Sequence, residues 1–396
     1  MLGVEVLYLA LANCFLNFGL LPKAFEGTNS VKGELGSGWT ILPGRVHIRN
    51  LRITIQDHNV QSLIEIARAD VVLSLHELPF MVFHATKVRG SGLVFRFRHR
   101  VMPESRDFPS VRAVPPIRGF EDPPLFEAWV PEPPIPDDKY NLWTVHLEDV
   151  DVHADELWVQ QFRYVGKARA VGAFRLKAAR TLWVGPAYLD LEPSRIVVDG
   201  HDAIDDFGGR IDCTVHPFDV RKPQGLEVLR YISTKLRLRG KIVSGAFVDL
   251  FVDPSSHVHV QQAGATLAVD ATLGHGVIAR GSRVALEGDS LHVGAGELGV
   301  DLPARWSVVA SAMDDQENGA GRVAVDVSRA ILDRRGSKAA PTTVRDVELG
   351  VASNTLDTAA PWALREADLS LGDLVAPDLR IFNDVRFGSV RFRGGA

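Results

Sequence analysis

Two short motifs in this sequence have residue types and spacings that serve ligand chemistry in other proteins. Gly294, Gly296 and Gly299 match the G-x-G-x-x-G pattern of dinucleotide-binding turns and follow a strand-like segment. That pattern holds a pyrophosphate only when a helix begins directly after it, because the helix N-terminus supplies the binding amides. The segment that follows is β-like and contains Pro303. A glycine-rich turn between two strands is therefore the preferred interpretation.

His257 and His259 would lie on one face of a strand, a spacing that metal sites use. No third ligand has a convincing spacing, so we interpret the pair as a solvent-facing strand surface. The acidic run at 199–206 lacks the residue order of a calcium loop. The chain contains no nucleophile elbow, zinc-protease helix or phosphate loop. We expect no catalytic residue, no metal and no cofactor, and we do not expect an enzyme.

The composition sets further bounds. The chain has 396 residues, 46% of them hydrophobic, and a net charge of −5 without a strongly basic patch, which argues against nucleic acid as a partner. Its two cysteines, Cys14 and Cys213, lie in unrelated contexts, so a disulfide framework is not expected.

The first twenty residues contain one ionisable side chain, Glu5, and residues 4–21 form an apolar run of 18 residues. As a helix this run would be about 27 Å long, which is just enough to cross a hydrocarbon core. Asn13 and Asn17 are costly in lipid, and a cleaved signal peptide or a buried soluble helix are the alternatives. We expect residues 1–22 to form a retained membrane anchor, and 23–38 to form a polar, glycine-rich connector.

The rest of the chain, 39–396, is predicted to be a β domain. Val46 and Ile48 alternate with polar residues, the phase slips at Arg49–Asn50, and the alternation resumes at Leu51. Such a slip is typical of a bulged strand. Many similar segments follow with turn signals every 8–12 residues, which favours an antiparallel sheet. Helix is scarce, the best candidates being 224–236 and a short piece at 76–83.

Residues 101–138 contain ten of the 22 prolines. Because proline fixes φ and removes a hydrogen-bond donor, this segment is predicted to be an exposed loop insertion and not a central strand. A plain surface insertion is the preferred interpretation. A partner-docking role through Phe120, Phe126 and Trp129 is the alternative.

The order of these elements resembles the start of AsmA-like proteins. That family has an N-terminal membrane helix, a strand of the form PGxVxIxxLxI, an alternating strand, a short helical piece and a K/R-V-x-G-x-x-hydrophobic strand. The matching segments of this chain are 4–21, 43–55, 69–75, 78–83 and 87–97. The proline-rich insertion is not part of the family pattern, and the resemblance is clearest over the first 100 residues.

The resemblance implies a single-pass protein of the bacterial inner membrane, with its body in the periplasm. It also implies a mainly β fold: an N-terminal transmembrane helix followed by an elongated, curled antiparallel sheet with an open groove and few short helices. The expected function is to bind or conduct lipid acyl chains in envelope lipid transport or biogenesis. The expected partners are the membrane and phospholipid, with envelope proteins as possible further partners.

Alternating apolar positions are the expected lining of such a groove, because an open sheet must cover its apolar face or leave it wet. Each position is equally well explained as core packing. The alternative function is a structural or scaffold envelope protein whose β body packs on itself and whose proline-rich loop docks a partner. The nine expected lining residues are Ile48, Ile53, Leu73, Phe95, Phe97, Leu147, Val152, Phe174 and Leu176.

Overall fold

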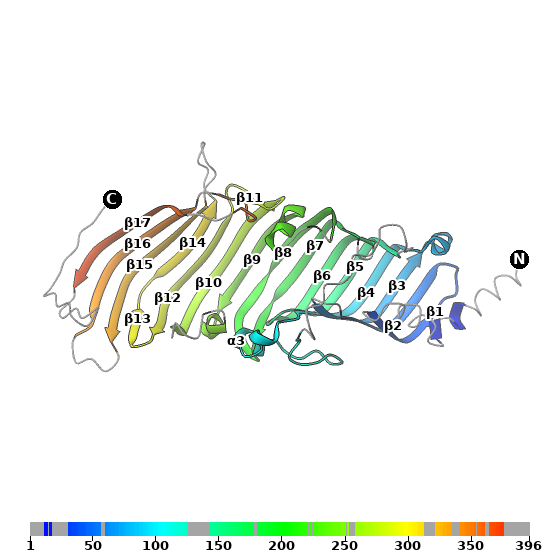
Figure 1. Cartoon of the computed structure of the whole chain (residues 1–396), viewed down its shortest axis with the longest axis horizontal. Helices are drawn as coiled ribbons and strands as arrows, with labels where there is room; N and C mark the ends of the chain where they lie inside the picture. Colours follow the sequence, from blue (N-terminus) through cyan, green and yellow to red (C-terminus); the bar gives the residue numbers. More distant parts are fainter. Residues whose placement is uncertain are drawn as a thin grey trace, which may run out of the picture. The chain divides into compact units, whose positions relative to one another are not determined.

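The computed structural model describes most of the chain and confirms a mainly β fold (Figure 1). Its described strands, 17 in number, belong to one hydrogen-bonded sheet, and the helices are short. The chain divides into two compact units, 1–194 with 212–224 and 195–211 with 225–396. The described residues are 12–14, 16–17, 31–56, 60–125, 143–177, 180–220, 222, 225–250, 252, 258–312, 321–334, 340–353, 355–360 and 364–375.

The described part of the first unit contains six complete neighbouring strands, three short helices and helical residues at 12–14 and 16–17. Its strands are β1 (Val31–Trp39), β2 (Arg45–Gln56), β3 (Val60–Leu73), β4 (Val82–His99), β5 (Thr144–Val159) and β6 (Phe162–Lys177). Its helices are η1 (Leu75–Phe80), η2 (Pro103–Ser105) and α3 (Pro109–Arg112). Strands β7 (Thr181–Val198) and β8 (His201–Asp219) contribute residues to both units.

The expectation of an antiparallel sheet is wrong for the pair β4–β5. Strands β4 and β5 run parallel, whereas β1–β2, β2–β3, β3–β4 and β5–β6 are antiparallel. Antiparallel neighbours can be joined by a tight turn, but parallel neighbours need a long crossover. The proline-rich insertion between His99 and Thr144 provides that crossover, so the sheet is mixed because of it.

The predicted phase slip in β2 is confirmed, and its neighbours share it. Asn50 has a φ of 53° and is skipped in the pairing with β3, where Ala67 is skipped as well. Gly36 in β1 and Gly92 in β4 lie at the same level. Gly92 has a φ of 69°, and a Cβ there would lie 2.6 Å from the Ala67 Cβ. Because the neighbouring strands slip together, apolar side chains stay on one face on both sides of the slip.

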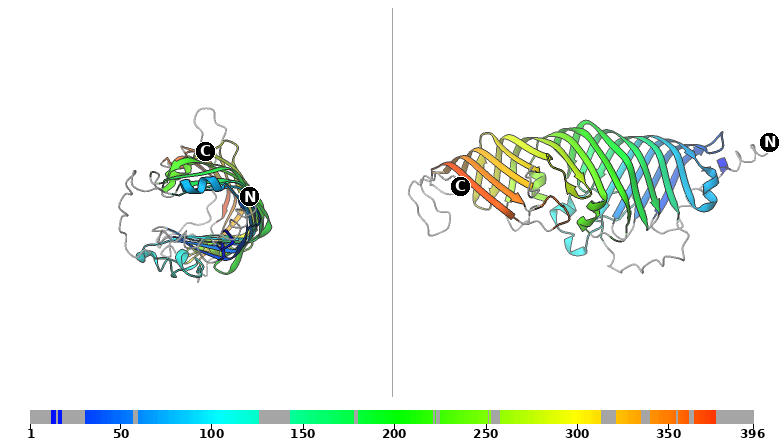
Figure 2. Two further views of the ribbon diagram at one scale, coloured as in Figure 1. Left: turned by 90° about the vertical axis from the view of Figure 1, so that its right-hand side faces the viewer. Right: turned by 90° about the horizontal axis from the view of Figure 1, so that it is seen from above.

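The strands of this unit are also bent along their length, as the end-on view shows (Figure 2). Register shifts between Leu147 and Val150 and between Ala154 and Glu156 lie in the pairing of β5 with β6. Irregularities of this kind bend a strand and increase its twist.

Residues 101–125 of the insertion pack on the sheet, which corrects the expectation of an exposed excursion. Ile117 is buried against Leu63 of β3 and Trp158 of β5, and Phe120 packs beside them. Arg98, whose side chain is fully buried, donates hydrogen bonds to Gln61 Oε1 (2.8 Å), and, within the insertion, to Pro115 O, Asp122 Oδ1 and Glu121 O (3.2, 2.7 and 2.6 Å). Phe126 and Trp129 lie outside the described residues.

The expected connector 23–38 is wrong from Val31 onward, because β1 begins there and pairs with β2. The pairing is made by main-chain hydrogen bonds, which need no particular side chains. The glycine-rich sequence of β1 therefore lacks the alternating apolar pattern from which a strand is predicted. The first strand is also paired on its other side. Asn17 exchanges hydrogen bonds with Gly38 N and O (3.2 and 2.6 Å), and Asn13 does so with Thr40 N and O (2.9 and 3.0 Å).

The expected anchor at 1–22 lies mostly outside the described residues. Residues 12–14 and 16–17 are helical, and Leu16 is buried beside Gly38 of β1. Among the described residues, no helix combines the length and apolar character that crossing a membrane requires.

The second unit has its own apolar core. Its strands are β9 (Ile232–Ile242), β10 (Val258–Gly274), β11 (Val277–Ile278), β12 (Arg283–Ala295), β13 (Leu298–Leu302), β14 (Trp306–Ala312), β15 (Gly321–Arg334), β16 (Thr342–Ser353) and β17 (Leu364–Val375), with helices η3 (Gly225–Tyr231) and η4 (Ala246–Leu250). Trp306 is 4% exposed and packs with Ala265 and Val327. The glycine-rich motif forms the turn between β12 and β13, where Ala295 pairs with Leu298, as expected.

Candidate functional site

The candidate site is one face of the first unit, which we call the apolar face. Residues paired directly across neighbouring strands point to the same side of a sheet. Ile53 of β2 pairs with Ile64 of β3, Ile64 with Phe95 of β4, and Phe95 with Leu157 of β5. Other rungs on the same face are Leu51–Ile66–Leu93, Val46–Val71–Val88–Val150 and Ala85–Leu147–Phe174.

The structure brings all nine predicted lining residues together on this face. They lie on β2 to β6, and the cross-strand pairing, with its register shifts taken into account, puts them on the same side of the sheet. The Phe95 and Phe97 rings are nearly parallel, with their centroids 6.5 Å apart. The pairing also adds residues that sequence reasoning did not select, among them Ile64, Ile66 and Leu157. The alternation of apolar and polar residues along β3 and β5 could have identified them from the sequence.

The exposure of these side chains separates an open face from a closed core. Eight of the nine residues are only partly buried. Val152 is the exception at 6% exposed, because it lies over Gly90, where a Cβ would be 3.2 Å from both Val152 methyl groups. A second layer packed on this face would bury most of these side chains, as sheet-on-sheet packing does.

The opposite face of the same strands is charged. Arg169 makes two hydrogen bonds to Asp151 (2.9 and 2.8 Å), which lower the pKa of that carboxyl group and raise that of the guanidinium. Glu156 accepts hydrogen bonds from Arg96 (3.0 Å) and Arg163 (2.9 Å). The two faces therefore differ in chemistry, and the charged face is the one on which 101–125 packs.

One edge of the first unit carries a group of exposed apolar side chains, which we call the apolar rim. Two backbone hydrogen bonds lie at this edge: Leu73 N donates to Gly44 O (2.6 Å), and Thr144 N donates to Met81 O (2.9 Å). The helical residues near Asn13 lie beside this edge through the contact with Thr40. The rim consists of Trp39, Ile41, Leu42, Phe80 and Trp143, whose exposed fractions are 41, 64, 53, 78 and 45%.

Comparison with known proteins adds no identity. No family model matches the chain, and no curated protein matches it. The apolar face and the apolar rim are therefore the features of the chain that bear on its function.

Proposed function

We infer that the protein binds lipid acyl chains along the apolar face of its first unit, as a membrane-held component of envelope lipid transport or biogenesis. The observation that carries this proposal is the partial exposure of eight of the nine lining side chains on one continuous apolar face. Apolar surface that the chain does not cover itself favours an apolar ligand.

The energetics of acyl chains suit such a surface. Burial of each methylene is worth about 0.8 kcal/mol, so ten covered methylenes give about 8 kcal/mol before the cost of ordering the chain. The apolar face extends over five neighbouring strands, β2 to β6. The headgroup would remain in water, where no specific polar pocket is required for it.

The apolar rim supports contact with a membrane. Tryptophan and other aromatic residues are favoured at the boundary between lipid headgroups and hydrocarbon. Trp39 is the last residue of β1 and Trp143 directly precedes β5 at the same edge, and Phe80 is the most exposed of the group. Asn13 and Asn17 of the apolar N-terminal run lie next to this edge. The resemblance to AsmA-like proteins supports a position in the bacterial inner membrane with the body in the periplasm.

The alternative is a scaffold protein with a self-packed β body and a docking loop. The partial exposure of the apolar face disfavours a self-packed body in the first unit. Packing of 101–125 on the charged face leaves Phe120 engaged within the protein and so gives the docking loop no support.

The test is to purify the full chain in a mild detergent, extract it, and measure bound acyl lipids by mass spectrometry. We expect lipid in the wild type and a several-fold loss in Phe95→Asp and in Phe97→Asp. Val72→Asp is the matched control, because Val72 lies on the charged face, paired with Arg45 and Lys87. A wild type without acyl lipid would overturn the proposal. Global unfolding of the phenylalanine variants, seen by circular dichroism, would identify both residues as core and also count against it.

A further inference from the structure

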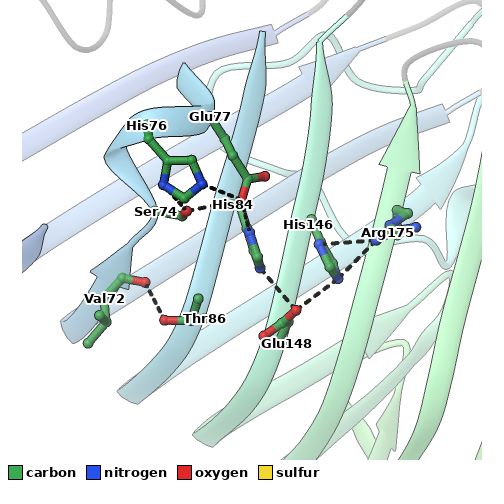
Figure 3. Close-up of polar contacts among 9 residues, drawn as sticks. All are labelled: Val72, Ser74, His76, Glu77, His84, Thr86, His146, Glu148 and Arg175. Carbon is green, nitrogen blue, oxygen red and sulfur yellow. Dashed lines mark hydrogen bonds and ion pairs between the residues drawn. The ribbon is translucent and has the colours of Figure 1, made fainter. Parts of the chain in front are cut away.

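A compact group of polar side chains lies on the charged face, next to helix η1 (Figure 3). His84 of β4 and His146 of β5 are direct partners in the parallel pair, and their rings stack with centroids 4.3 Å apart. Glu148 extends from β5 toward both rings, and its Oε1 lies 3.0 Å from His84 Nε2 and 3.7 Å from His146 Nε2. Both histidine side chains are mostly buried, at 13 and 14% exposed.

These three side chains have the chemistry of a transition-metal site. One donor atom from each lies within 4.8 Å of the other two. Ligand atoms about 2.0–2.2 Å from a tetrahedral zinc ion are about 3.3–3.6 Å from one another, a range that the observed 3.0 and 3.7 Å bracket. Two imidazoles and one carboxylate form a zinc ligand set that leaves a fourth position for water.

Glu77 of η1 supplies the outer contact that metal-binding histidines use. Its Oε1 lies 2.8 Å from His84 Nδ1, and Ser74 Oγ donates a hydrogen bond to the same oxygen (3.0 Å). A carboxylate on Nδ1 places the proton there and leaves the Nε2 lone pair for a metal. Among the described residues, buried His84 Nε2 has no contact with hydrogen-bond geometry, and it forms the ion-pair contact with Glu148 Oε1 given above.

Arg175 of β6 opposes a metal at this position. Its Nη2 lies 3.2 Å from His146 Nδ1 and adds positive charge there. Because the guanidinium donates to Nδ1, it favours the tautomer in which Nε2 carries the proton and has no lone pair for a metal. The histidine planes are only 12° apart, so their lone pairs run side by side and do not converge. Metal binding therefore requires the His146 ring to turn and the Arg175 side chain, which is exposed, to move away.

We propose that His84, His146 and Glu148 bind one divalent transition metal ion of the zinc class, with Glu77 orienting His84 and Arg175 acting as a competitor for the site. The ion would join β4 to β5 at the parallel pair that the long crossover creates. This site is on the charged face and is independent of lipid binding on the apolar face.

The test is calorimetric titration of the metal-stripped full chain with Zn²⁺ near neutral pH. We expect one site, its loss in His84→Ala, and an affinity at least tenfold lower in Glu148→Gln and about tenfold lower in Glu77→Gln. Arg175→Gln should bind more tightly than the wild type, a result that a merely structural role for the cluster does not predict. Titration with Co²⁺, followed by visible spectroscopy, should give the absorption of a tetrahedral centre.

His153→Ala is the matched control, because His153 is an exposed histidine of the same strand β5 outside the cluster. Its affinity should equal that of the wild type. Unchanged zinc affinity in Glu148→Gln and in Arg175→Gln would overturn the proposal and assign any bound zinc to scattered surface histidines. Glu148 is half exposed, so its variant tests the proposal even if His84→Ala does not fold.

Discussion

The contact between Arg98 and the insertion gives a prediction whose size can be worked out from the structure. We consider the substitution Arg98→Met, which keeps an unbranched apolar stem and removes the guanidinium. The four hydrogen bonds described above are then lost. Gln61 Oε1 and the carbonyl groups of Pro115 and Glu121 lose a donor, while Asp122, at 46% exposed, regains water.

Each buried acceptor that loses its partner costs about 1–3 kcal/mol. The hydrogen bonds to Pro115 and Glu121 are only partly buried, so we use the lower value for all three acceptors, and detachment of the insertion becomes easier by about 3 kcal/mol. Since 1.4 kcal/mol is a factor of ten, the detached fraction should rise about 100-fold.

Limited trypsin digestion measures that fraction at Arg118. This side chain is exposed, but its neighbour Ile117 is buried, and Arg52 Nη2 donates a hydrogen bond to Arg118 O (2.8 Å). Cleavage after Arg118 therefore requires the segment to leave the sheet, and Arg98→Met should accelerate it about 100-fold. Arg112→Met is the matched control, because its ion pair with Asp107 is exposed and worth little. Equal cleavage rates after Arg118 in the two variants would refute the reasoning.

Two further predictions concern the second unit and the histidine cluster. Gly288→Ala should lower the free energy of unfolding by about 1–3 kcal/mol, because its Cβ would lie 2.7 Å from the Trp306 ring. Gly264→Ala, which has open space, should be neutral in the same urea titration, and equal effects would contradict the packing described. The hydrogen bond to Glu77 raises the pKa of His84, so its stabilising ion pair is complete below about pH 6.5 and is lost as the pH rises through the raised pKa. The loss of stability in His84→Gln should thus be larger at about pH 5.5 than at about pH 9, and a constant difference would exclude this linkage.

Alternation identified the strands of the first unit well, because one face is apolar and the other charged. The slip at Asn50 was visible since an extra residue shifts every later side chain by one position. Alternation carries no information on strand direction, however. The parallel pairing of β4 with β5 was therefore missed, although the long proline-rich connection was a usable signal for it.

The helix predicted at 224–236 shows a second limit. The structure has the short helix η3 followed by strand β9, which begins at Ile232. Leu236 and Leu238 also fit an alternating pattern, so this short apolar run did not distinguish the 3.6-residue period of a helix from the two-residue period of a strand. The short helix predicted at 76–83 is confirmed in part by η1, which spans Leu75–Phe80. The histidine cluster was missed because only pairing brings β4 beside β5, although His146-x-Glu148 already placed two ligand types on one strand face.

The side-chain amides of Asn17 and Asn13 bond the outer main-chain groups of Gly38 in β1 and of Thr40 just after it, in the manner of an additional strand. Four residues of helix rise about 6 Å and two residues of strand about 6.6 Å, so the two spacings agree. Preparations that remove the first thirty residues for solubility would strip away this cover. Their bare N–H and C=O groups would then be a template for self-association, and oligomers seen in such samples would reflect the trimming and not the native assembly.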